Sequence, residues 1–238
     1  MAVGGDALAA LLDRPIYAAL TSRQAGFALG APPALRFRPE VEPFIAAADD
    51  SPAALAALAA LCAPGEQLVL LQAAASKLPP DLIELSCRPA VQMIAIDAPA
   101  SSPPDGARPL GEADAPDMQA LAELTAPGPF RAETWRLGGF WGVRDGGRLI
   151  AMAGERLAVP GAAELSGVCT HPDARGRGLA RALSTWKLHD IARRGEQVFL
   201  HAYVDNAPAV ALYCDLGFTV RATMTAQVVA LAPDDHRG

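Results

Sequence analysis

A strand–loop–helix segment limits what this chain can fold into more than any other part of the sequence. In LSGVCTHPDARGRGLARAL (residues 165–183), an apolar strand pattern ends at His171, a glycine-containing loop follows, and a helical pattern begins near Leu179. Gly176 and Gly178 have no Cβ, so the loop backbone can approach a ligand closely. The first N–H groups of the helix have no partner within it, and the helix dipole adds positive charge there. The segment therefore predicts an anion site suited to a diphosphate.

Three arginines surround this loop: Arg175, Arg177 and Arg181. Because the whole chain has a formal net charge of −6, they concentrate positive charge locally. The Walker loop GxxxxGK[ST] does not fit, since no lysine follows Gly178. The dinucleotide fingerprint GxGxxG does not fit either, because Arg181 occupies the position of its third glycine. The loop thus differs from both common nucleotide-binding loops.

Composition indicates a globular protein with a substantial core, because 51% of the 238 residues are hydrophobic and 19% are charged. The acidic balance argues against binding a nucleic-acid backbone, which requires a surplus of lysine and arginine. No apolar stretch approaches the ~18 residues of a membrane-spanning helix, and the start lacks the basic flank of a signal peptide. The four cysteines form neither a CxxC pair nor a zinc-ligand spacing. We therefore expect free thiols, a cytoplasmic protein and no metal site.

The chain divides at a segment rich in proline, serine and glycine. We predict an N-terminal α/β domain over residues 1–100, a linker over 101–109 and a second domain over 110–238. The first part has a helix capped by Ser51 and apolar strand patterns, but no residues arranged for chemistry. The second part predicts helix, hairpin, strand, glycine loop, helix, strand, helix and strand, with the hairpin turn at 145–147. The expected fold class is α/β, of the α+β type, with a mixed central β-sheet flanked by helices.

Two motifs together resemble a known family. Residues 175–180 match the [Q/R]-x-x-G-x-[G/A] loop of the GNAT (Gcn5-related) N-acetyltransferases. Downstream, DNAPAVALYCDLGF resembles the second GNAT signature, N-x-x-A-x-x-x-Y-x-x-x-G-F, at Asn206, Ala209, Tyr213, Gly217 and Phe218. The resemblance covers residues 110–238 and, with VCTHPDARGRG and a long N-terminal half, is similar to the FR47-like branch. It implies a GNAT fold for this part and a degenerate copy of that fold for the N-terminal half.

The resemblance implies acetyl-CoA as the acyl donor. N–H groups of the glycine loop would hold the pyrophosphate, and the edge of the preceding strand would pair with the pantetheine arm. Asn206 would hydrogen-bond the pantetheine, and Tyr213 would protonate the leaving thiolate. The donor-binding residues implied in this way are Val168, Cys169, Thr170, Arg175, Gly176, Arg177, Gly178, Leu179, Ala180, Arg181 and Asn206.

The strand before the loop has an expected geometry of its own. Alternation along it places four side chains on one face, those of Glu164, Ser166, Val168 and Thr170. Cys169 then points to the other face, so we expect its side chain in the core and only its backbone at the donor.

The acceptor amine must lose a proton before it attacks. An amine with a pKa of ~10.4 is neutral in fewer than about one molecule in a thousand at pH 7, a deficit of roughly 4–5 kcal/mol. Three residues are candidates for the catalytic base: Glu155, Glu164 and His201. Glu155 is slightly preferred, because the family commonly places an acidic base on the central strands.

Each candidate base also has a purely structural interpretation. Glu155 could pair with Arg156 or Arg148 at the end of the hairpin, and Glu164 could be solvated at the start of its strand. His201 could be a core histidine whose ring nitrogens are satisfied by neighbours. The sequence alone leaves these alternatives open.

The function predicted from the sequence is transfer of an acetyl group from acetyl-CoA to a small amine or a peptide amine, by direct attack in a ternary complex. The alternative is a non-catalytic acyl-CoA-binding sensor or scaffold, and a weaker one is nucleotide binding through the same loop. The loop LTAPGPFRAETWRLGG (residues 124–139) is expected to lie over the acceptor pocket. The identity of the acceptor, the length of the acyl group and the oligomeric state stay open.

Overall fold

A computed structural model describes residues 4–233 of the chain. The first part forms α1 (Gly5–Asp13), α2 (Pro15–Leu20), η1 (Ala25–Phe27), β1 (Ala28–Ala31), β2 (Ala34–Phe37), β3 (Ile45–Ala47), α3 (Pro52–Ala59), β4 (Leu68–Gln72) and β5 (Leu82–Ala95). The second part forms β6 (Ala107–Pro109), η2 (Glu112–Asp114), α4 (Ala115–Thr125), η3 (Thr134–Leu137), β7 (Trp141–Asp145), β8 (Arg148–Val159), β9 (Ala162–Thr170), η4 (Pro172–Ala174), α5 (Leu179–Ala192), β10 (Gln197–Tyr203), α6 (Ala207–Asp215) and β11 (Phe218–Leu231). The predicted order of elements in the second part is confirmed.

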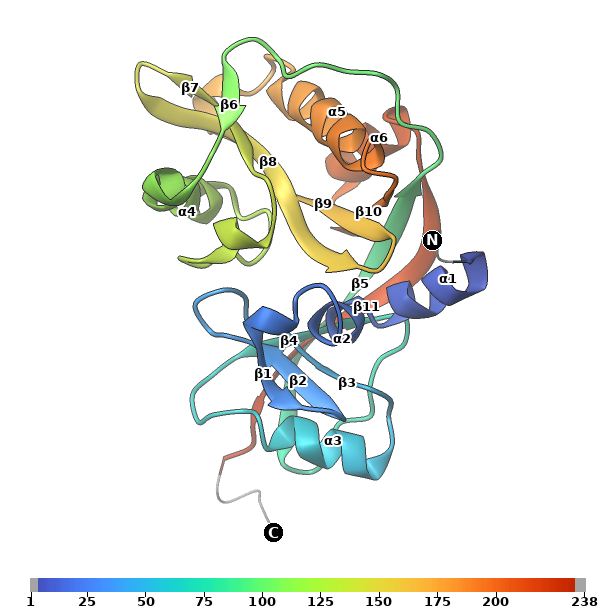
Figure 1. Cartoon of the computed structure of the whole chain (residues 1–238). Coiled ribbons are helices and arrows are strands. Elements are labelled where there is room, and N and C mark those ends of the chain that lie inside the picture. Colours follow the sequence, from blue (N-terminus) through green and yellow to red (C-terminus); the bar gives the residue numbers. More distant parts are fainter. Residues whose placement is uncertain (1–3, 234–238) are drawn as a thin grey trace.

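Two sheets organise the molecule (Figure 1). The large sheet has eight strands in the order β4-β11-β5-β10-β9-β8-β7-β6, and the small sheet has the order β1-β2-β3. Within the large sheet, β9 and β10 run parallel, whereas the other neighbours run antiparallel. Helices α5 and α6 cover one face of this sheet, and α4 covers the other. The fold class predicted from the sequence is therefore confirmed.

Local sequence signals account for several element boundaries. Asp145 pairs with Arg148 across the hairpin turn, where Gly146 and Gly147 have φ angles of 55° and 86° that favour glycine. Helix α3 begins after Ser51, whose hydroxyl oxygen accepts a hydrogen bond from the N–H of Ala54 at 3.3 Å. A side-chain cap of this kind satisfies a backbone donor that the helix itself cannot.

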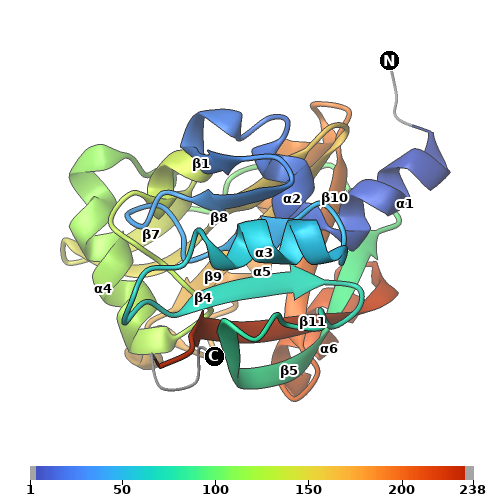
Figure 2. The same ribbon diagram turned by 90° about the horizontal axis from the view of Figure 1, so that it is seen from below.

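The N-terminal part contributes strands to the large sheet. β5 lies between β10 and β11, and β4 pairs with the outer edge of β11, as the view from below shows (Figure 2). The predicted linker over 101–109 is irregular until β6 begins at Ala107. The division into residues 1–100 and 110–238 stays a prediction, as does a degenerate copy of the fold in the first part.

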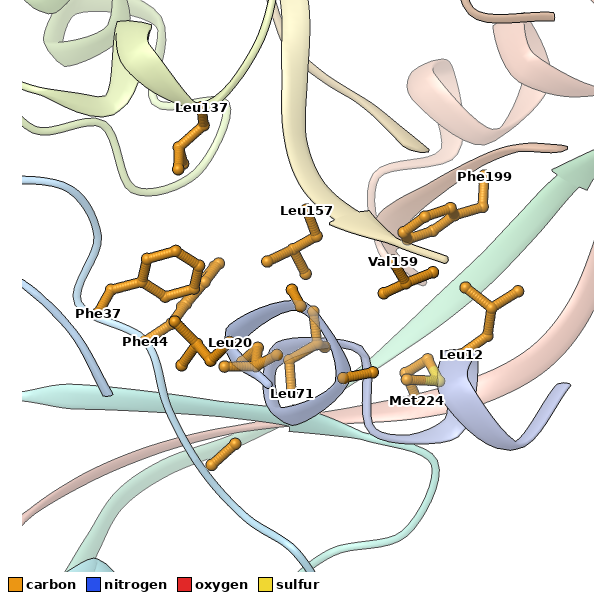
Figure 3. Close-up of a cluster of buried hydrophobic side chains, with 14 of the residues drawn as sticks. Leu12, Leu20, Phe37, Phe44, Leu71, Leu137, Leu157, Val159, Phe199 and Met224 are labelled. Carbon is orange, nitrogen blue, oxygen red and sulfur yellow. The ribbon is translucent and has the colours of Figure 1, made fainter. Parts of the chain in front are cut away.

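A hydrophobic core joins the N-terminal part to the large sheet (Figure 3). Leu12 and Leu20 come from α1 and α2, and they share a cluster with Leu157 of β8 and Phe199 of β10. Val198, next to Phe199, belongs to the cluster on the α5 side instead. The N-terminal layer therefore packs on the face of the sheet opposite α5. Within residues 4–233, no helix is long and apolar enough to cross a membrane.

Candidate active site

The two parallel strands separate halfway along their length. β9 and β10 are paired only from Ala162 and Gln197 to Glu164 and Phe199, although β9 continues to Thr170 and β10 to Tyr203. Beyond this point each strand presents backbone groups that the other does not bind. The sheet is thus open in its centre, at the residues that the sequence assigns to the donor.

A β-bulge changes which way the end of β9 faces. Ser166 lies opposite Gly154, but Cys169 lies opposite Met152, so β9 has one residue more than β8 in this stretch. Gly167 has a φ of 62°, which suits glycine at a bulge. The extra residue interrupts strict alternation. The prediction that Glu164 shares a face with Val168 and Thr170 assumed strict alternation along β9, and it is therefore wrong.

Beyond the bulge the side chains of β9 take opposite environments. Val168 packs against the cluster on the α5 side, and Thr170 lies opposite Ala151 of that cluster. Cys169 is 2% exposed within the cluster under α4. Burial raises the pKa of its thiol to about 11, so the thiol stays protonated. The expectation that the Cys169 side chain belongs to the core is confirmed.

A cavity of about 150 Å³ passes through the sheet where the strands separate. One end is bounded by α6 and by β9, and the other end by the N-terminal part and β8. Pro127, Gly128 and Pro129 of the loop after α4 line it, whereas the prediction that residues 124–139 lie over an acceptor pocket stays a prediction. The other lining residues are Phe44, Val69, Leu71, Ala90, Arg156, Leu165, Ser166, Gly167, Val168, His201, Ala202, Tyr203, Asn206, Ala209, Tyr213 and Ala226.

The glycine loop forms a shallow groove at the start of α5. Gly176 and Gly178 have φ angles of 77° and 74°, and Gly178 precedes the helix without a side-chain cap. The groove is lined by Thr170, Ala174, Arg175, Gly176, Gly178, Leu179, Ala180, Arg181 and Leu212. It therefore brings together most of the residues predicted to bind the donor, beside backbone N–H groups that the helix leaves unpaired.

The loop arginines differ in their partners. Arg177 pairs with Asp145 at 3.2 Å and Arg181 with Asp215 at 2.7 Å, all four side chains being exposed. Arg175 is exposed and has no ion pair with any residue of 4–233. An anion in the groove would thus meet Arg175 without displacing a carboxylate.

Tyr213 and Asn206 are both placed at the cavity by α6. Asn206 caps the helix, since its side-chain oxygen accepts from the N–H of Ala209 at 3.3 Å, and its amide nitrogen is left for another partner. Tyr213 is 8% exposed, and burial raises the pKa of its phenol to about 12. The hydroxyl is therefore a proton donor throughout the neutral range.

Glu164 and His201 come together at the cavity with Arg156. Glu164 accepts from Arg156 at 2.8 and 3.1 Å and from the N–H of Leu157, and it lies 2.8 Å from Nδ1 of His201. Burial alone would raise the pKa of Glu164, but the charge of Arg156 and the contact with His201 outweigh it and lower the pKa to about 2. Glu164 is thus an ionised carboxylate that its neighbours hold in place.

Glu155 lies elsewhere. Its carboxylate binds Nζ of Lys187 at 2.8 Å and Arg194 at 2.6 Å, and Lys187 also binds Asp190 of α5 at 2.7 Å. Lys187 is fully buried in this network. Glu155 lies opposite Leu165, whose side chain packs on the α5 side, and it does not line the cavity. The structure therefore brings two of the three candidate bases together and leaves the preferred one apart.

Several residues at the site escape sequence reasoning. Phe44 and Arg156 line the cavity, Gln92 contacts His201, and Glu42 is fully buried beside them. No local motif marks these residues, because their roles depend on contacts between distant parts of the chain. Within residues 4–233, no group of three or more His, Cys, Asp or Glu side chains could hold a metal ion.

Known proteins are similar to this chain over different parts of its length. The family model described as "FR47-like protein" matches residues 140–227. Two mycothiol acetyltransferases match part of the chain: that of Geodermatophilus obscurus is 34% identical over 119 residues, covering 43% of this chain and 39% of its own. The mycothiol acetyltransferase of Thermomonospora curvata is 38% identical over 112 residues, which cover 45% of this chain and 36% of its own. The chain thus matches less than two fifths of the length of these two curated relatives.

Solved structures match over much more of the chain. A crystal structure described as an acetyltransferase from the GNAT family, from Novosphingobium aromaticivorans, is 41% identical and covers 93% of this chain and 99% of its own, with a TM-score of 0.87. A GCN5-related N-acetyltransferase from Kribbella flavida shares the fold, with 19% identity, a TM-score of 0.59 and coverage of 90% and 95%. The chain therefore belongs to the GNAT family of acetyltransferases, in its FR47-like branch.

Proposed function

We propose that this chain transfers an acetyl group from acetyl-CoA to an amine, by direct attack within a ternary complex. The observation that carries the proposal is the cavity through the sheet, which has Tyr213 and Asn206 at one end and Phe44 and Arg156 at the other. A thioester entering from the α6 end and an amine entering from the N-terminal end would meet in it. Holding both reactants in one cavity makes a covalent acyl-enzyme unnecessary.

The donor would bind along α5 and β9. Its pyrophosphate would accept hydrogen bonds from the N–H groups around Leu179, at the positive end of the helix dipole. Arg175 is available to the phosphates, whereas Arg177 and Arg181 would exchange their surface carboxylate partners for them. The pantetheine would follow the open edge of β9 and meet the amide nitrogen of Asn206.

We assign the role of proton acceptor to His201, with Glu164 as its support. Of the three candidate bases, His201 is the one that lines the cavity. As the amine nitrogen attacks the thioester carbon and the C–S bond breaks, the amine proton would pass to Nε2 of His201, which must first release the hydrogen bond that it accepts from the Gln92 amide. The Glu164 carboxylate, held by Arg156, would stabilise the imidazolium that forms.

Tyr213 would complete the proton balance. The departing sulfur takes both electrons of the C–S bond and needs a proton, which the buried phenol can donate. Because a thiol with a pKa near ~8.5 is already a fair leaving group, this assistance is worth less than removal of the amine proton.

The acceptor class in this proposal is a small amine or a peptide amine. The curated relatives are named mycothiol acetyltransferases, but the matched part covers at most 39% of their length, so that name alone does not choose the acceptor here. We place the reaction in the cytoplasm, a proposal supported by the four free cysteines.

Calorimetric titration with acetyl-CoA tests the donor site. Gly178→Glu puts bulk and negative charge where the pyrophosphate would lie, and we expect it to abolish binding. Gly195→Glu is the matched control, because Gly195 lies just beyond the other end of α5 with a similar φ of 78° and equally open surroundings. Binding that survives Gly178→Glu, or is lost equally in both variants, would count against the proposed donor site.

Turnover separates the enzyme from its alternatives. An N-acetyltransferase releases CoA thiol in an amine-dependent reaction, whereas a sensor binds acetyl-CoA and releases none. Competition by ADP that does not depend on the pantetheine arm would favour the nucleotide-binding alternative.

A further inference from the structure

Among the described residues that line the cavity, Arg156 alone has a side chain of the lysine, arginine, aspartate or glutamate type. Its side chain is 11% exposed. Nε and Nη2 both donate to Glu164, and the guanidinium carbon lies 5.0 Å from the centre of the Phe44 ring. These contacts fix the plane of the guanidinium, and the negative charge of Glu164 compensates the positive charge of Arg156.

The third nitrogen of Arg156 is unused. Nη1 donates to no acceptor within residues 4–233, and it lies 3.5 Å from where a methyl group on Gly128 would be. Gly128 lines the cavity from the loop that covers it. A guanidinium nitrogen with free N–H groups at a cavity wall is a position for an anionic oxygen.

A narrow recess opens beside this nitrogen. Arg156, Ser166 and Gly128 line both the main cavity and the recess, so the two spaces adjoin. The Ser166 hydroxyl makes no hydrogen bond within the described part of the chain and gives a second donor. The recess is small, about 10 Å³, so it has room for about one oxygen atom of a carboxylate and not for a phosphate group.

Apart from Tyr203, the rest of this end of the cavity is mainly apolar. Phe44, Val69 and Leu71 of the N-terminal part form the wall with Ala90 of β5 and Ala226 of β11. Such a wall favours a hydrocarbon side chain over a polar or charged one.

We propose that Arg156 and Ser166 bind a carboxylate of the acceptor, and that the acceptor is an amino acid with an apolar side chain. This inference rests on the proposed acetyl transfer and names its substrate class. One oxygen of the carboxylate would enter the recess, the hydrocarbon would lie on the Phe44 wall, and the amine would point toward His201 and the thioester.

Matched acceptors test the proposal on the unaltered protein. Leucine, leucinamide and 3-methylbutylamine share one hydrocarbon and one amine, but only leucine has a carboxylate. Compared per unprotonated amine, we expect kcat/KM for leucine to exceed the other two by about 10- to 100-fold, as for a hydrogen bond to a charged group. Equal values for the three would overturn the carboxylate site while leaving acetyl transfer intact.

Two variants locate the effect. Arg156→Lys keeps the charge beside Glu164 but loses the free guanidinium nitrogen, and Ser166→Ala removes the second donor. We expect Ser166→Ala to raise KM for leucine about tenfold or more, with little change for 3-methylbutylamine or in acetyl-CoA affinity. Arg156→Lys also loosens Glu164 and so slows both acceptors; we expect it to lower the ratio of kcat/KM for leucine to that for 3-methylbutylamine about tenfold or more. Arg36→Lys is the matched control, because Arg36 is equally buried and paired twice with Glu66, away from the cavity. A leucine KM that changes equally in Arg36→Lys would overturn the assignment.

One further outcome separates this inference from the proposed function. If acetyl-CoA binds but no amine is acetylated, calorimetric binding of leucine to the CoA complex is compared with that of 3-methylbutylamine. Selective binding of leucine, lost in Arg156→Lys, would support the carboxylate site even though acetyl transfer fails. Absence of that selectivity would overturn it.

Discussion

His201 donates the proton on its Nδ1 to Oε1 of Glu164 across 2.8 Å, and Gln92 fixes that direction. Arg221 donates to the side-chain oxygen of Gln92, so the group 2.9 Å from Nε2 of His201 is the amide nitrogen. An amide N–H only donates, so Nε2 accepts and the ring proton is on Nδ1. Both ring nitrogens are therefore engaged: Nδ1 donates to an ionised carboxylate, and the lone pair of Nε2 accepts from Gln92.

Replacing His201 tests its assignment as proton acceptor. His201→Gln keeps a polar group beside Glu164 but cannot take the amine proton, so we expect kcat to fall at least about 100-fold. Calorimetric affinity for acetyl-CoA should stay the same. A fall in kcat of less than about tenfold would show that the base is another group.

Tyr213→Phe tests the proton donor. Burial raises the pKa of Tyr213 to about 12, so the phenol stays protonated through neutral pH and can protonate the leaving sulfur. We expect kcat to fall about tenfold, less than for His201→Gln, because the thiolate leaves readily without help. Steady-state kinetics of the two variants under one condition make the comparison. A larger loss in Tyr213→Phe would reverse the order of importance.

Glu155→Gln tests a structural role for the residue that the sequence favours as base. The change leaves buried Lys187 with one carboxylate fewer, which we expect to lower the free energy of unfolding by about 3 kcal/mol. Well below the melting temperature, kcat should change by less than twofold. Urea unfolding and steady-state rates measure the two effects separately. Normal stability with a large loss of kcat would return Glu155 to the role of base.

Glu42 predicts a pH-dependent loss of stability. Its carboxyl is fully buried and makes no hydrogen bond within residues 4–233, and burial raises its pKa to about 8, although Arg156 acts to lower it and Glu164 to raise it further. Thr134 and Arg131, which also lie near, act to lower the pKa. The unfolded chain releases this proton near pH ~4.3, so the folded state binds one proton more between that pH and about 8. Stability therefore falls as the pH rises through this range.

Glu42→Gln should remove that loss, because the amide cannot ionise. We expect the variant to be more stable than the unaltered protein by ~3 kcal/mol at pH 7 and by little at pH 4.5. Urea unfolding at the two pH values measures the difference. Glu133→Gln is the control, since Glu133 is partly exposed and ion-paired on the neighbouring loop. A gain for Glu42→Gln that does not depend on pH would contradict the titration.

The sequence determined the elements whose causes are local. The glycines before α5 allow a loop that approaches an anion, and Gly146 with Gly147 closes the β7–β8 hairpin. Asn206 caps α6, so Tyr213 two turns later reaches the cavity. The loop, the hairpin and the cap each depend on residues within about ten positions of one another, so local spacing predicted them, whereas the family resemblance gave Tyr213 its expected place.

The tertiary structure decided which side chains meet. The bulge at Gly167 changes the face of every later residue of β9, and no alternating pattern reveals one extra residue. Glu155 and Glu164 look equivalent in sequence, yet the first binds Lys187 of α5 and the second binds His201 and Arg156. Phe44 and Glu42 reach β8 only through the N-terminal layer, more than a hundred positions away in the chain. Such contacts arise from strand register and layer packing, which depend on the free energy of the whole fold and leave no mark at any one residue.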